Sequence, residues 1–332
     1  MLDLHRLRLL RELSRRGTLA AVAKALSYTP SAISQQLTRL EEEVGVPLRE
    51  QVGRKVRLTA QGEILVAHTE AVLERLERAE SELAASMTEL TGTLRIAAFQ
   101  TTMLSLVPEA LSGLRRAHPR LRVEVTQAEP EEALPLLLTR DFDLVIGEEY
   151  PHDPEPRPVE VEQEDLVEDV IRLACPRTFT DAEVVGTESA VPGLGAEPRP
   201  LPADPGEADP AAMLRSAATL PWIMEPPRNA ARRWALALCR DAGFEPDVRI
   251  VTADALTCLR FVEQGHGVAL ISDLVWAARE PTVPLYPLPQ PWGRRRLFTA
   301  ARRGSGAHPA VRACRDALCA AAKATPIRSM PA

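Results

Sequence analysis

The sequence predicts an α/β protein with a helical, winged head, one long linker helix and a body in which strands and helices alternate. Three observations lead to this fold class. Residues 19–45 have the pattern of two helices around a tight turn, residues 59–90 keep a helical period, and strands alternate with helices beyond Gly92. At ~100–200 residues per domain, a chain of 332 residues has room for two domains and their cores.

The most informative element is a helix expected over residues 30–43. Thr29 stands where an N-cap oxygen is needed, and Pro30 takes the first helical position, where no N–H has to be satisfied. One face of this helix is an apolar stripe made of Ile33, Leu37, Leu40 and Val44. The opposite face carries polar side chains suited to base edges and phosphates, namely Ser31, Ser34, Gln35, Thr38 and Arg39. A helix-turn-helix of this kind predicts sequence-specific DNA binding.

Two further helices and a hairpin complete the head. We expect helices over residues 4–14 and 18–26. Residues 52–59 alternate in the manner of a two-stranded hairpin with Arg54 at its tip, which would lie beside the helix-turn-helix as a wing. The winged head is therefore expected to span residues 1–58.

The charge distribution supports a nucleic-acid partner for the head alone. The whole chain has a net charge of −6, but residues 1–65 hold eleven Lys and Arg against seven Asp and Glu, which leaves −10 on the remainder. A basic head on an acidic body is expected where only the head meets phosphate. The chain has no uncharged apolar run of ~18 residues and its N-terminus is charged, so we expect a cytoplasmic protein without a membrane span.

Residues 59–90 are expected to form a linker helix with a coiled-coil seam. The seam residues recur at steps near three and four, and they are Leu65, His68, Val72, Leu76, Ala79, Leu83 and Leu90. Because an isolated helix cannot bury such a stripe, we predict pairing with a second subunit. The alternative is that the stripe packs against the chain's own body.

The order of elements beyond Gly92 predicts parallel strands joined by crossover helices. In the first set we expect strands over 93–99, 121–127 and 143–148, with helices over 103–117 and 131–139. In the second set we expect strands over 168–174, 221–224, 247–253, 268–273 and 295–302, with helices over 228–242, 255–264 and 309–323. Residues 181–211 are rich in Pro and Gly without periodicity, so we expect a flexible surface insertion there.

The chain offers no pattern for a metal, a cofactor or a catalytic centre. Its five cysteines form no C-x-x-C pair and its six histidines no i, i+4 pair, so we expect reduced, buried thiols and no metal site. A redox switch through Cys175 or Cys258 is the alternative. Phosphate-loop, nucleophile-elbow and zinc-protease motifs are absent, and the GHG at 265–267 follows a helix and lacks a third glycine.

Several segments together carry a family resemblance. They are AAVAKALSYTPSAISQQLTRLEEEVGVPL and GRKVRLTAQGE in the head, then TGTLRIAAF, LPWI, CRDAGFEPDV and VTADALTCLRFVEQGHGVALIS in the same order. On these segments the chain resembles the LysR-type transcriptional regulators. Family members usually carry Leu-Phe-x-Arg before the wing, where this chain has Leu48-Arg49-Glu50-Gln51. The family's wing packing and one phosphate contact therefore do not carry over.

The resemblance implies a two-lobed effector domain of the periplasmic-binding-protein type (type 2). Lobe I would comprise residues 92–162 and 269–323, and lobe II residues 163–268, with hinges near 162–164 and Gly267. Closure of the lobes on a small molecule would change the angle between paired subunits, and so the spacing of their heads. The resemblance also implies a homodimer or homotetramer, with RNA polymerase as a further candidate partner.

The candidate DNA-binding residues lie on the third helix and the wing. We expect Thr29, Pro30, Ser31, Ser34, Gln35 and Thr38 to face the major groove, Arg39 to meet phosphate, and Arg54 and Lys55 to meet phosphate or the minor groove. Gln35 is the strongest candidate for base readout, because a Gln amide pairs bidentately with adenine. Simple solvation is the alternative for Ser34 and Thr38.

The candidate effector residues lie where strands end and helices begin. They are Gln100, Thr101 and Thr102, then Gln127 and Glu129 in lobe I, and Arg228, Asn229, Ala253 and Asp254 in lobe II. Free N–H groups and two hydroxyls there favour an anion such as a carboxylate. Glu129 and Asp254 would repel a dianion, which leaves an amine-bearing or neutral ligand open. Helix capping is the alternative role of the two threonines, and Trp222 is expected to be a core residue.

The predicted function is a transcription regulator that binds double-stranded promoter DNA and responds to a small-molecule effector between two lobes. Two other functions are weighed against it. A helix-turn-helix that makes protein contacts only is disfavoured by the basic head, and a catalytic two-lobed enzyme by the missing motifs. No cofactor and no catalytic residue are expected.

Overall fold

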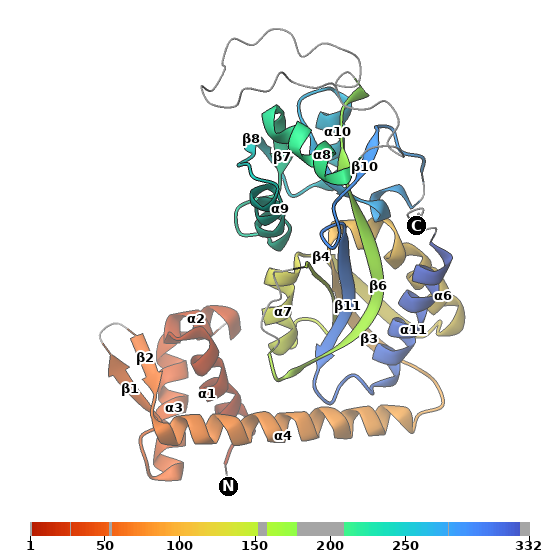
Figure 1. Ribbon diagram of the computed structural model, residues 1–332. Helices are drawn as coiled ribbons and strands as arrows, with labels where there is room; N and C mark the ends of the chain where they lie inside the picture. The colour runs from red at the N-terminus through yellow and green to blue at the C-terminus, as the bar shows by residue number, and fades with distance from the viewer. Residues whose placement is uncertain are drawn as a thin grey trace. The chain divides into compact units, whose positions relative to one another are not determined.

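The chain divides into two compact units. The computed structural model describes residues 2–26, 28–52, 55–151, 158–177, 209–277 and 279–325, with the Lys55 side chain left out. One unit comprises Met1–Leu83 with Arg303–Ser305, and the other comprises Ala84–Arg302 and Gly306–Ala332. The first holds the head and most of the long helix, and the second holds the α/β body (Figure 1). Among the described residues, no helix is long and apolar enough to cross a membrane.

The head contains three helices and a hairpin, as predicted. Its elements are α1 (Leu4–Arg16), α2 (Leu19–Leu26), α3 (Pro30–Val44), β1 (Arg49–Val52) and β2 (Lys55–Leu58). The Asp3 carboxylate accepts hydrogen bonds from the first N–H groups of α1, and Gly17 ends this helix at a φ of 71°. The hairpin is antiparallel, with Arg49 opposite Leu58. The first strand of the wing therefore begins earlier than the predicted residue 52.

The linker helix α4 (Ala60–Ala85) begins against the base of the wing. Thr59 caps it, because its hydroxyl accepts from the Gly62 N–H at 3.1 Å and donates to the Pro47 carbonyl at 2.8 Å. A Cβ on Gly62 would lie 2.1 Å from the Leu48 carbonyl oxygen, so only glycine permits this approach. The buried positions of α4 are Gly62, Thr69, Leu73, Glu77 and Ser81.

The stripe predicted as a coiled-coil seam lies on a different face of α4 from the buried positions. Val72 is 45% and Leu83 is 70% exposed, while Leu65 and Leu76 are half-buried. His68 and Ala79 are also exposed. Leu65 packs against the head's own hydrophobic core, whereas Val72 and Leu83 expose apolar surface.

The body is built on a mixed seven-stranded sheet and a small parallel pair. The large sheet has the order β10-β6-β11-β5-β3-β4, with β9 also paired to β6. Its strands are β3 (Gly92–Ala98), β4 (Leu121–Gln127), β5 (Leu144–Glu149), β6 (Val161–Ala174), β9 (Ala269–Ser272), β10 (Leu285–Pro287) and β11 (Arg294–Arg302). The small pair is β7 (Pro221–Met224) with β8 (Asp247–Val251). Parallel pairing holds for β3 with β4 and β5, whereas β11 runs antiparallel to β5 and β6.

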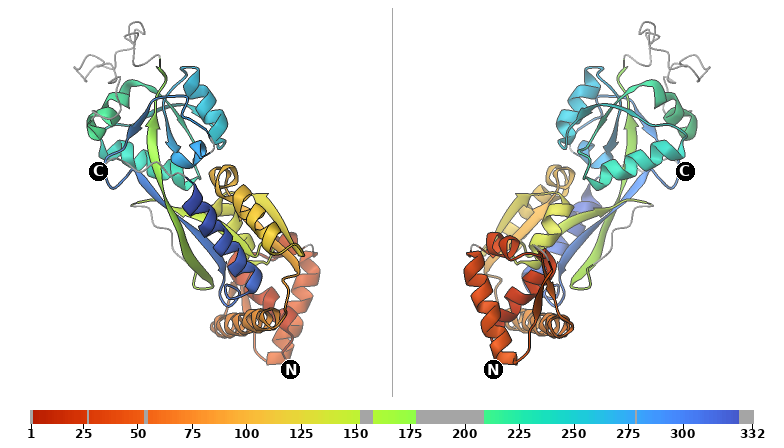
Figure 2. Two further views of the ribbon diagram at one scale, coloured as in Figure 1. Left: turned by 90° about the vertical axis from the view of Figure 1, so that its right-hand side faces the viewer. Right: turned by 90° about the vertical axis from the view of Figure 1, so that its left-hand side faces the viewer.

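Helices cover the sheets as Figure 2 shows. They are α5 (Gln100–Leu104), α6 (Leu106–Ala117), α7 (Pro130–Leu138), α8 (Pro210–Ser216), α9 (Ala230–Asp241), α10 (Ala255–Glu263) and α11 (Pro309–Ala324), with 3₁₀ turns η2 (Ala217–Thr219) and η3 (Asp273–Trp276). The helix predicted over 103–117 is thus two helices that begin at Gln100. Helix α8 starts inside the predicted insertion 181–211, of which residues 181–208 lie outside the described part.

Hydrophobic clusters divide the body into two halves. Leu166 and Val167 of β6 pack with the β3, α6 and α11 cluster, while Ile171 and Leu173 pack with the β7 and α9 cluster. Strands β6 and β11 run on between the halves (Figure 1). Ala269, Ile271 and Val275, predicted for lobe I, pack with Ile223 and Leu259 in the second half. We therefore propose lobe boundaries near Asp169 and Arg294 in place of the predicted 162–164 and 267–269.

Candidate functional site

The recognition helix α3 turns its polar face to solvent. The Thr29 hydroxyl accepts from the Ala32 N–H at 3.2 Å, which confirms the predicted N-cap. Ile33, Leu37 and Leu40 are at most 1% exposed and join the head's core, so the opposite side of the helix faces away from that core. The exposed candidates are Thr29, Pro30, Ser31, Gln35, Thr38 and Arg39, and Ser34 is half-buried.

Arg49 fastens the wing to this helix. Its guanidinium donates to the Thr38 hydroxyl at 2.8 Å and to the Ser34 carbonyl at 3.1 Å. The Glu41 carboxylate lies 3.4 Å from its Nε and accepts its backbone N–H at 3.2 Å. Arg49 thus stands where the family resemblance would place a packed aromatic, and it replaces that packing by a polar clamp. Sequence reasoning noticed the departure but did not foresee the contact.

Only part of the wing tip belongs to the described residues. Arg54 lies outside the described residues, as does the side chain of Lys55. On the neighbouring positions Arg57 pairs with Glu50 across the hairpin at 2.8 Å, and the Arg57 side chain is 75% exposed. The predicted wing contacts with DNA therefore remain a prediction.

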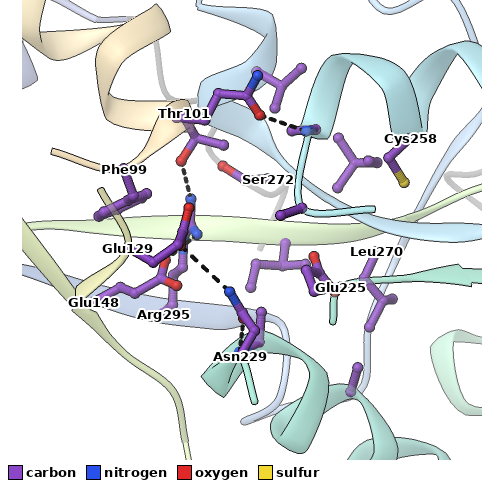
Figure 3. Close-up of a pocket in the computed structure, with 18 of the residues that line it drawn as sticks. Phe99, Thr101, Glu129, Glu148, Glu225, Asn229, Cys258, Leu270, Ser272 and Arg295 are labelled. Carbon is purple, nitrogen blue, oxygen red and sulfur yellow. Dashed lines mark hydrogen bonds and ion pairs between the residues drawn. The ribbon is translucent and has the colours of Figure 1, made fainter. Parts of the chain in front are cut away.

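A small cavity lies at the boundary between the two halves of the body. Its volume is about 80 Å³, and Figure 3 shows side chains from both halves around it. Six of the predicted effector residues line it, and they are Gln100, Thr101, Glu129, Asn229, Ala253 and Asp254. A water takes up ~30 Å³ of liquid, so a cavity of this size holds two or three waters or the head of a small ligand.

The three other predicted effector residues do not line the cavity. Thr102 is fully buried and its hydroxyl donates to the Phe99 carbonyl at 2.8 Å, a bond local to the start of α5. Gln127, the last residue of β4, is exposed, and so is Arg228. The structure therefore does not bring these three residues together with the other six around the cavity. Trp222 is fully buried in the core, as predicted.

Direct hydrogen bonds join the two halves around the cavity. The Gln100 side chain accepts from the Ala255 N–H at 2.6 Å and donates to the Asp254 carboxylate. The Glu131 carboxylate accepts from the Ala230 N–H at 2.7 Å. Gln100 and Glu131 belong to the first half, and their partners stand at the starts of α10 and α9 in the second. These hydrogen bonds hold the two halves together around the cavity.

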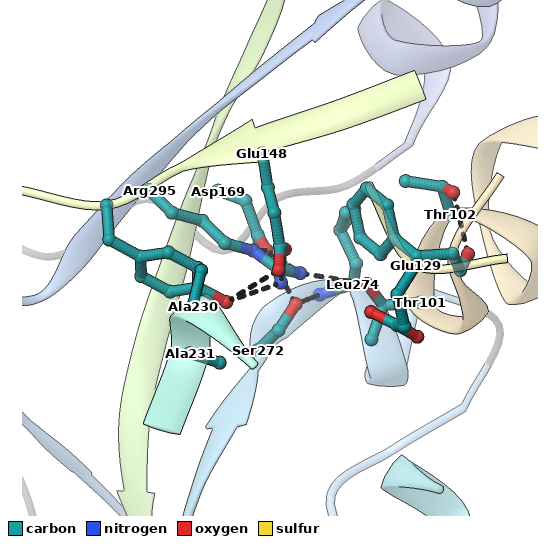
Figure 4. Close-up of polar contacts among 12 residues, drawn as sticks. Thr101, Thr102, Glu129, Glu148, Asp169, Ala230, Ala231, Ser272, Leu274 and Arg295 are labelled. Carbon is teal, nitrogen blue, oxygen red and sulfur yellow. Dashed lines mark hydrogen bonds and ion pairs between the residues drawn. The ribbon is translucent and has the colours of Figure 1, made fainter. Parts of the chain in front are cut away.

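The most heavily bonded side chain at the cavity is Arg295, which the sequence did not indicate. Its guanidinium donates to Asp169 at 2.8 Å, to Thr101 at 2.8 Å and to Glu148 (Figure 4). It also donates to the Tyr150 hydroxyl at 3.3 Å. Although burial alone would lower it, the Glu148 and Asp169 carboxylates hold the pKa of Arg295 well above its usual value. Arg295 is therefore a permanent, fully enclosed cation.

Two further carboxylates at the cavity are destabilised as anions. Burial, with the nearby Glu148 and Glu131 carboxylates, raises the pKa of Glu129 from 4.5 to about 7. Burial, with the Glu148 carboxylate, likewise raises the pKa of Glu225 to about 7. Both groups thus change charge near neutral pH. Glu225 was not among the predicted residues, although it directly follows the predicted strand 221–224.

The thiols and potential metal ligands point to no further chemistry. The five cysteines are free thiols, of which only Cys319 is not buried. Burial raises the pKa of Cys239 and of Cys314 to about 12, and it also raises the pKa of Cys258, which lines the cavity. Among the described residues, no group of three or more His, Cys, Asp or Glu side chains could hold a metal.

Comparisons with known proteins identify the family of both parts of the chain. Residues 4–63 match a family described as bacterial regulatory helix-turn-helix protein, lysR family, and residues 88–323 match the LysR substrate binding domain. A RuBisCO operon transcriptional regulator from Acidithiobacillus ferrooxidans is 35% identical over 43% of this chain and 46% of its own length, less than half of that relative. CysB from Burkholderia cenocepacia, named as an HTH-type transcriptional regulator, is 25% identical over 92% of this chain and 89% of its own.

Solved structures share the fold. A full-length OxyR variant from Pseudomonas aeruginosa superposes with a TM-score of 0.61 at 18% identity, covering 100% of this chain and 99% of that one. A Corynebacterium glutamicum OxyR mutant superposes with a TM-score of 0.53 at 19% identity, covering 98% and 92%. At this identity the likeness concerns the arrangement of elements and not the ligand.

Proposed function

Because the chain belongs to the LysR family of transcriptional regulators, which are DNA-binding proteins and not enzymes, we propose that α3 reads promoter DNA while the cavity beside Arg295 receives the effector. The observation that supports this most is the two-sided character of α3. Ile33, Leu37 and Leu40 anchor it in the head, and Ser31, Gln35 and Arg39 stay exposed on the other side. A helix placed in this way can enter a major groove without unfolding any packing.

The cavity supplies the effector response. Gln100 and Glu131 bridge the two halves directly, so a molecule that enters has to replace or rearrange these bonds. A ligand shifts the arrangement of the halves only by the difference in its affinity for their two positions. Binding between the halves therefore changes the shape of the body, and through α4 the placement of the head.

The same proposal extends to assembly and location. The exposed apolar residues Val72 and Leu83 on α4 suit a coiled-coil contact with a second copy of the chain. A homodimer or homotetramer would then present two or more heads to a partly palindromic promoter site, where RNA polymerase is a further candidate partner. Since promoter DNA of bacteria lies in the cytoplasm, we place the protein there.

DNA binding by the full chain tests this function. Fluorescence anisotropy with a duplex selected from a random pool should give an affinity whose logarithm falls linearly with the logarithm of salt concentration, because Lys and Arg side chains release counterions from phosphate. Arg39→Gln should flatten that slope by about one unit. The control Arg116→Gln removes an exposed body cation and should leave the slope unchanged. A slope near zero for the native chain would favour a head that makes protein contacts only.

A further inference from the structure

Carboxylates outnumber cations at the cavity between the two halves. Among the described residues that line it, the acidic ones are Glu129, Glu148, Glu225 and Asp254, and Arg295 is the one arginine or lysine. Asp169 adds another carboxylate directly behind Arg295. Figure 3 labels Glu129 and Glu225, one from each half of the body, among the residues that line the cavity. A ligand that enters therefore meets an excess of negative charge.

Arg295 is not available to bind an anion. All three of its guanidinium nitrogens are engaged: Nε by Asp169, Nη1 by Glu148 and the Tyr150 hydroxyl, and Nη2 by Thr101 and Asp169. Its two carboxylate neighbours are buried with it, since Asp169 is fully buried and Arg295 is 6% exposed. A carboxylate ligand would have to displace one of them and leave it without its partner in a dry site, which is strongly unfavourable.

The helix starts that face the cavity are also occupied. In α9 the Ala230 N–H donates a hydrogen bond to the Glu131 carboxylate, and the Ala231 N–H donates one to the Asn229 side chain. In α10 the Ala255 N–H is accepted by Gln100 and the Thr257 N–H by Asp254. The expectation that free N–H groups there favour an anion is therefore not met for these two helices. The remaining helix, α5, has only five residues.

Among the carboxylates that line the cavity, Glu148 is paired with Arg295, and Asp254 is held by hydrogen bonds from Gln100 and from the Thr257 N–H. That leaves Glu129 and Glu225. Among the described residues the printed contact of the Glu129 side chain is a long hydrogen bond of 3.5 Å from the Asn229 amide. The charged groups near Glu129 are Glu131, Glu148 and Glu225, which oppose its ionisation, and Arg295, which favours it. Those near Glu225 are Glu148, against ionisation, with Arg295 and Arg232 in favour. Arg232 donates to the Glu225 carbonyl at 2.8 Å.

Aromatic side chains line the same cavity. Trp234 is 2% exposed and Tyr150 is 5% exposed. Trp234 and Tyr150 also stack at 5.1 Å between ring centroids and give the cavity an aromatic wall that suits a cation.

Resting on the proposed function, we infer that the effector is a small ammonium compound and not a carboxylate. Its ammonium group lies between Glu129 of the first half and Glu225 of the second. A cation held by carboxylates from both halves stabilises their closed arrangement. The ligand binds with its amine protonated. A glutamate that is protonated before binding releases its proton to solvent when the ammonium group binds.

Calorimetric titration of the full chain tests the charge of the ligand. The probes are the two amines 2-aminoethanol and ethylamine and the carboxylate glycolate. At pH 8, each amine should bind at least tenfold more tightly than glycolate. The double variant Glu129→Gln/Glu225→Gln should lose at least tenfold in affinity for 2-aminoethanol. The control Glu132→Gln removes an exposed carboxylate from the same helix as Glu131 and should bind normally.

The pH dependence of the affinity distinguishes direct ligand binding by Glu129 and Glu225 from a purely structural role of these residues. Between pH 8 and pH 6 the affinity of the native chain for 2-aminoethanol should fall, while that of the double variant should stay constant. Tighter binding of glycolate, equal affinities in native chain and double variant, or no binding of either amine at millimolar concentration would each overturn the inference. The proposed function survives all three if the salt-dependent DNA binding is intact, so the two failures are distinguishable.

Discussion

The clamp made by Arg49 allows a sharp test of how the wing is held. Arg49→Met keeps the unbranched stem of the side chain and removes the guanidinium that donates to Thr38 and to the Ser34 carbonyl. Each of these two hydrogen bonds contributes ~0.5–1.5 kcal/mol net, and the partly buried pair with Glu41 adds ~0–1 kcal/mol. The variant should therefore weaken the packing of β1 on α3 by about 2 kcal/mol.

Hydrogen exchange followed by mass spectrometry measures this local effect, since a single melting temperature is ill-defined for a chain of several domains. Amides in peptides covering α3 and β1 should exchange about 30-fold faster in the variant, because ~1.4 kcal/mol corresponds to a factor of ten. Arg57→Met is the matched control: the same substitution in the same hairpin removes a pair whose arginine is 75% exposed. If both variants changed exchange equally, the clamp would have no special role.

Three further predictions follow from single contacts. Gly62→Ala places a methyl group against the Leu48 carbonyl, so the head's free energy of unfolding in urea should fall by ~1–3 kcal/mol. The control Gly113→Ala has open space at its Cβ and should be neutral or stabilising. Equal effects of the two substitutions would contradict the close approach at Gly62. Gln100→Ala removes the bonds to Asp254 and Ala255, so amide exchange at the start of α10 should rise, and unchanged exchange would mean that this bridge does not hold the halves. The pKa of Glu225 is about 7 in the folded chain, above the ordinary 4.5, so the native chain should lose stability as pH rises from 4.5 to 7. Glu225→Gln should therefore be more stable than the native chain at pH 8, on the order of 1–3 kcal/mol, but not at pH 4.5. A stability difference that did not vary with pH would refute the shift.

The head could be predicted almost to the residue because its signals are local. Thr29 and Gly17 bound their helices through hydrogen bonds to residues three or four positions away, and the apolar stripe of α3 follows the helical period. The seam on α4 is different. The sequence shows that its residues form a stripe, but the face buried in the single chain holds Leu73 and Ser81 instead.

The body was predicted less well where pairing is non-local. Strand β6 runs from Val161 to Ala174, but only its apolar end at 168–174 was expected, since its first half alternates charged residues that pair with β11. Short elements such as α5 and β10 carry too few residues for a periodic signal. The lobe boundaries that we propose differ from the predicted ones for the same reason. They depend on which hydrophobic clusters Ala269 and Leu166 join.

The candidate site shows the same division. Gln100, Glu129, Asn229 and Asp254 were found because strand ends and helix starts meet at the edge of an α/β sheet. Arg295, Glu148 and Asp169 were missed because they lie inside strands, where no neighbour in sequence marks them. Each of the three also stands beside other charged residues in its strand, such as Arg294, Glu149 and Glu168, so the sequence did not show which charge is buried.

Base readout by α3 is the central claim, and selection of bound duplexes from a random pool tests it most directly. The native chain should select a defined site, and Gln35→Ala should lose ~1–3 kcal/mol of preference at one base pair of that site. Gln36→Ala is the control, since the neighbouring Gln36 side chain accepts from Arg6 within the head and should leave the selected sequence unchanged. Selection of no sequence by the native chain, or an equal loss by Gln35→Ala on every sequence, would contradict the account.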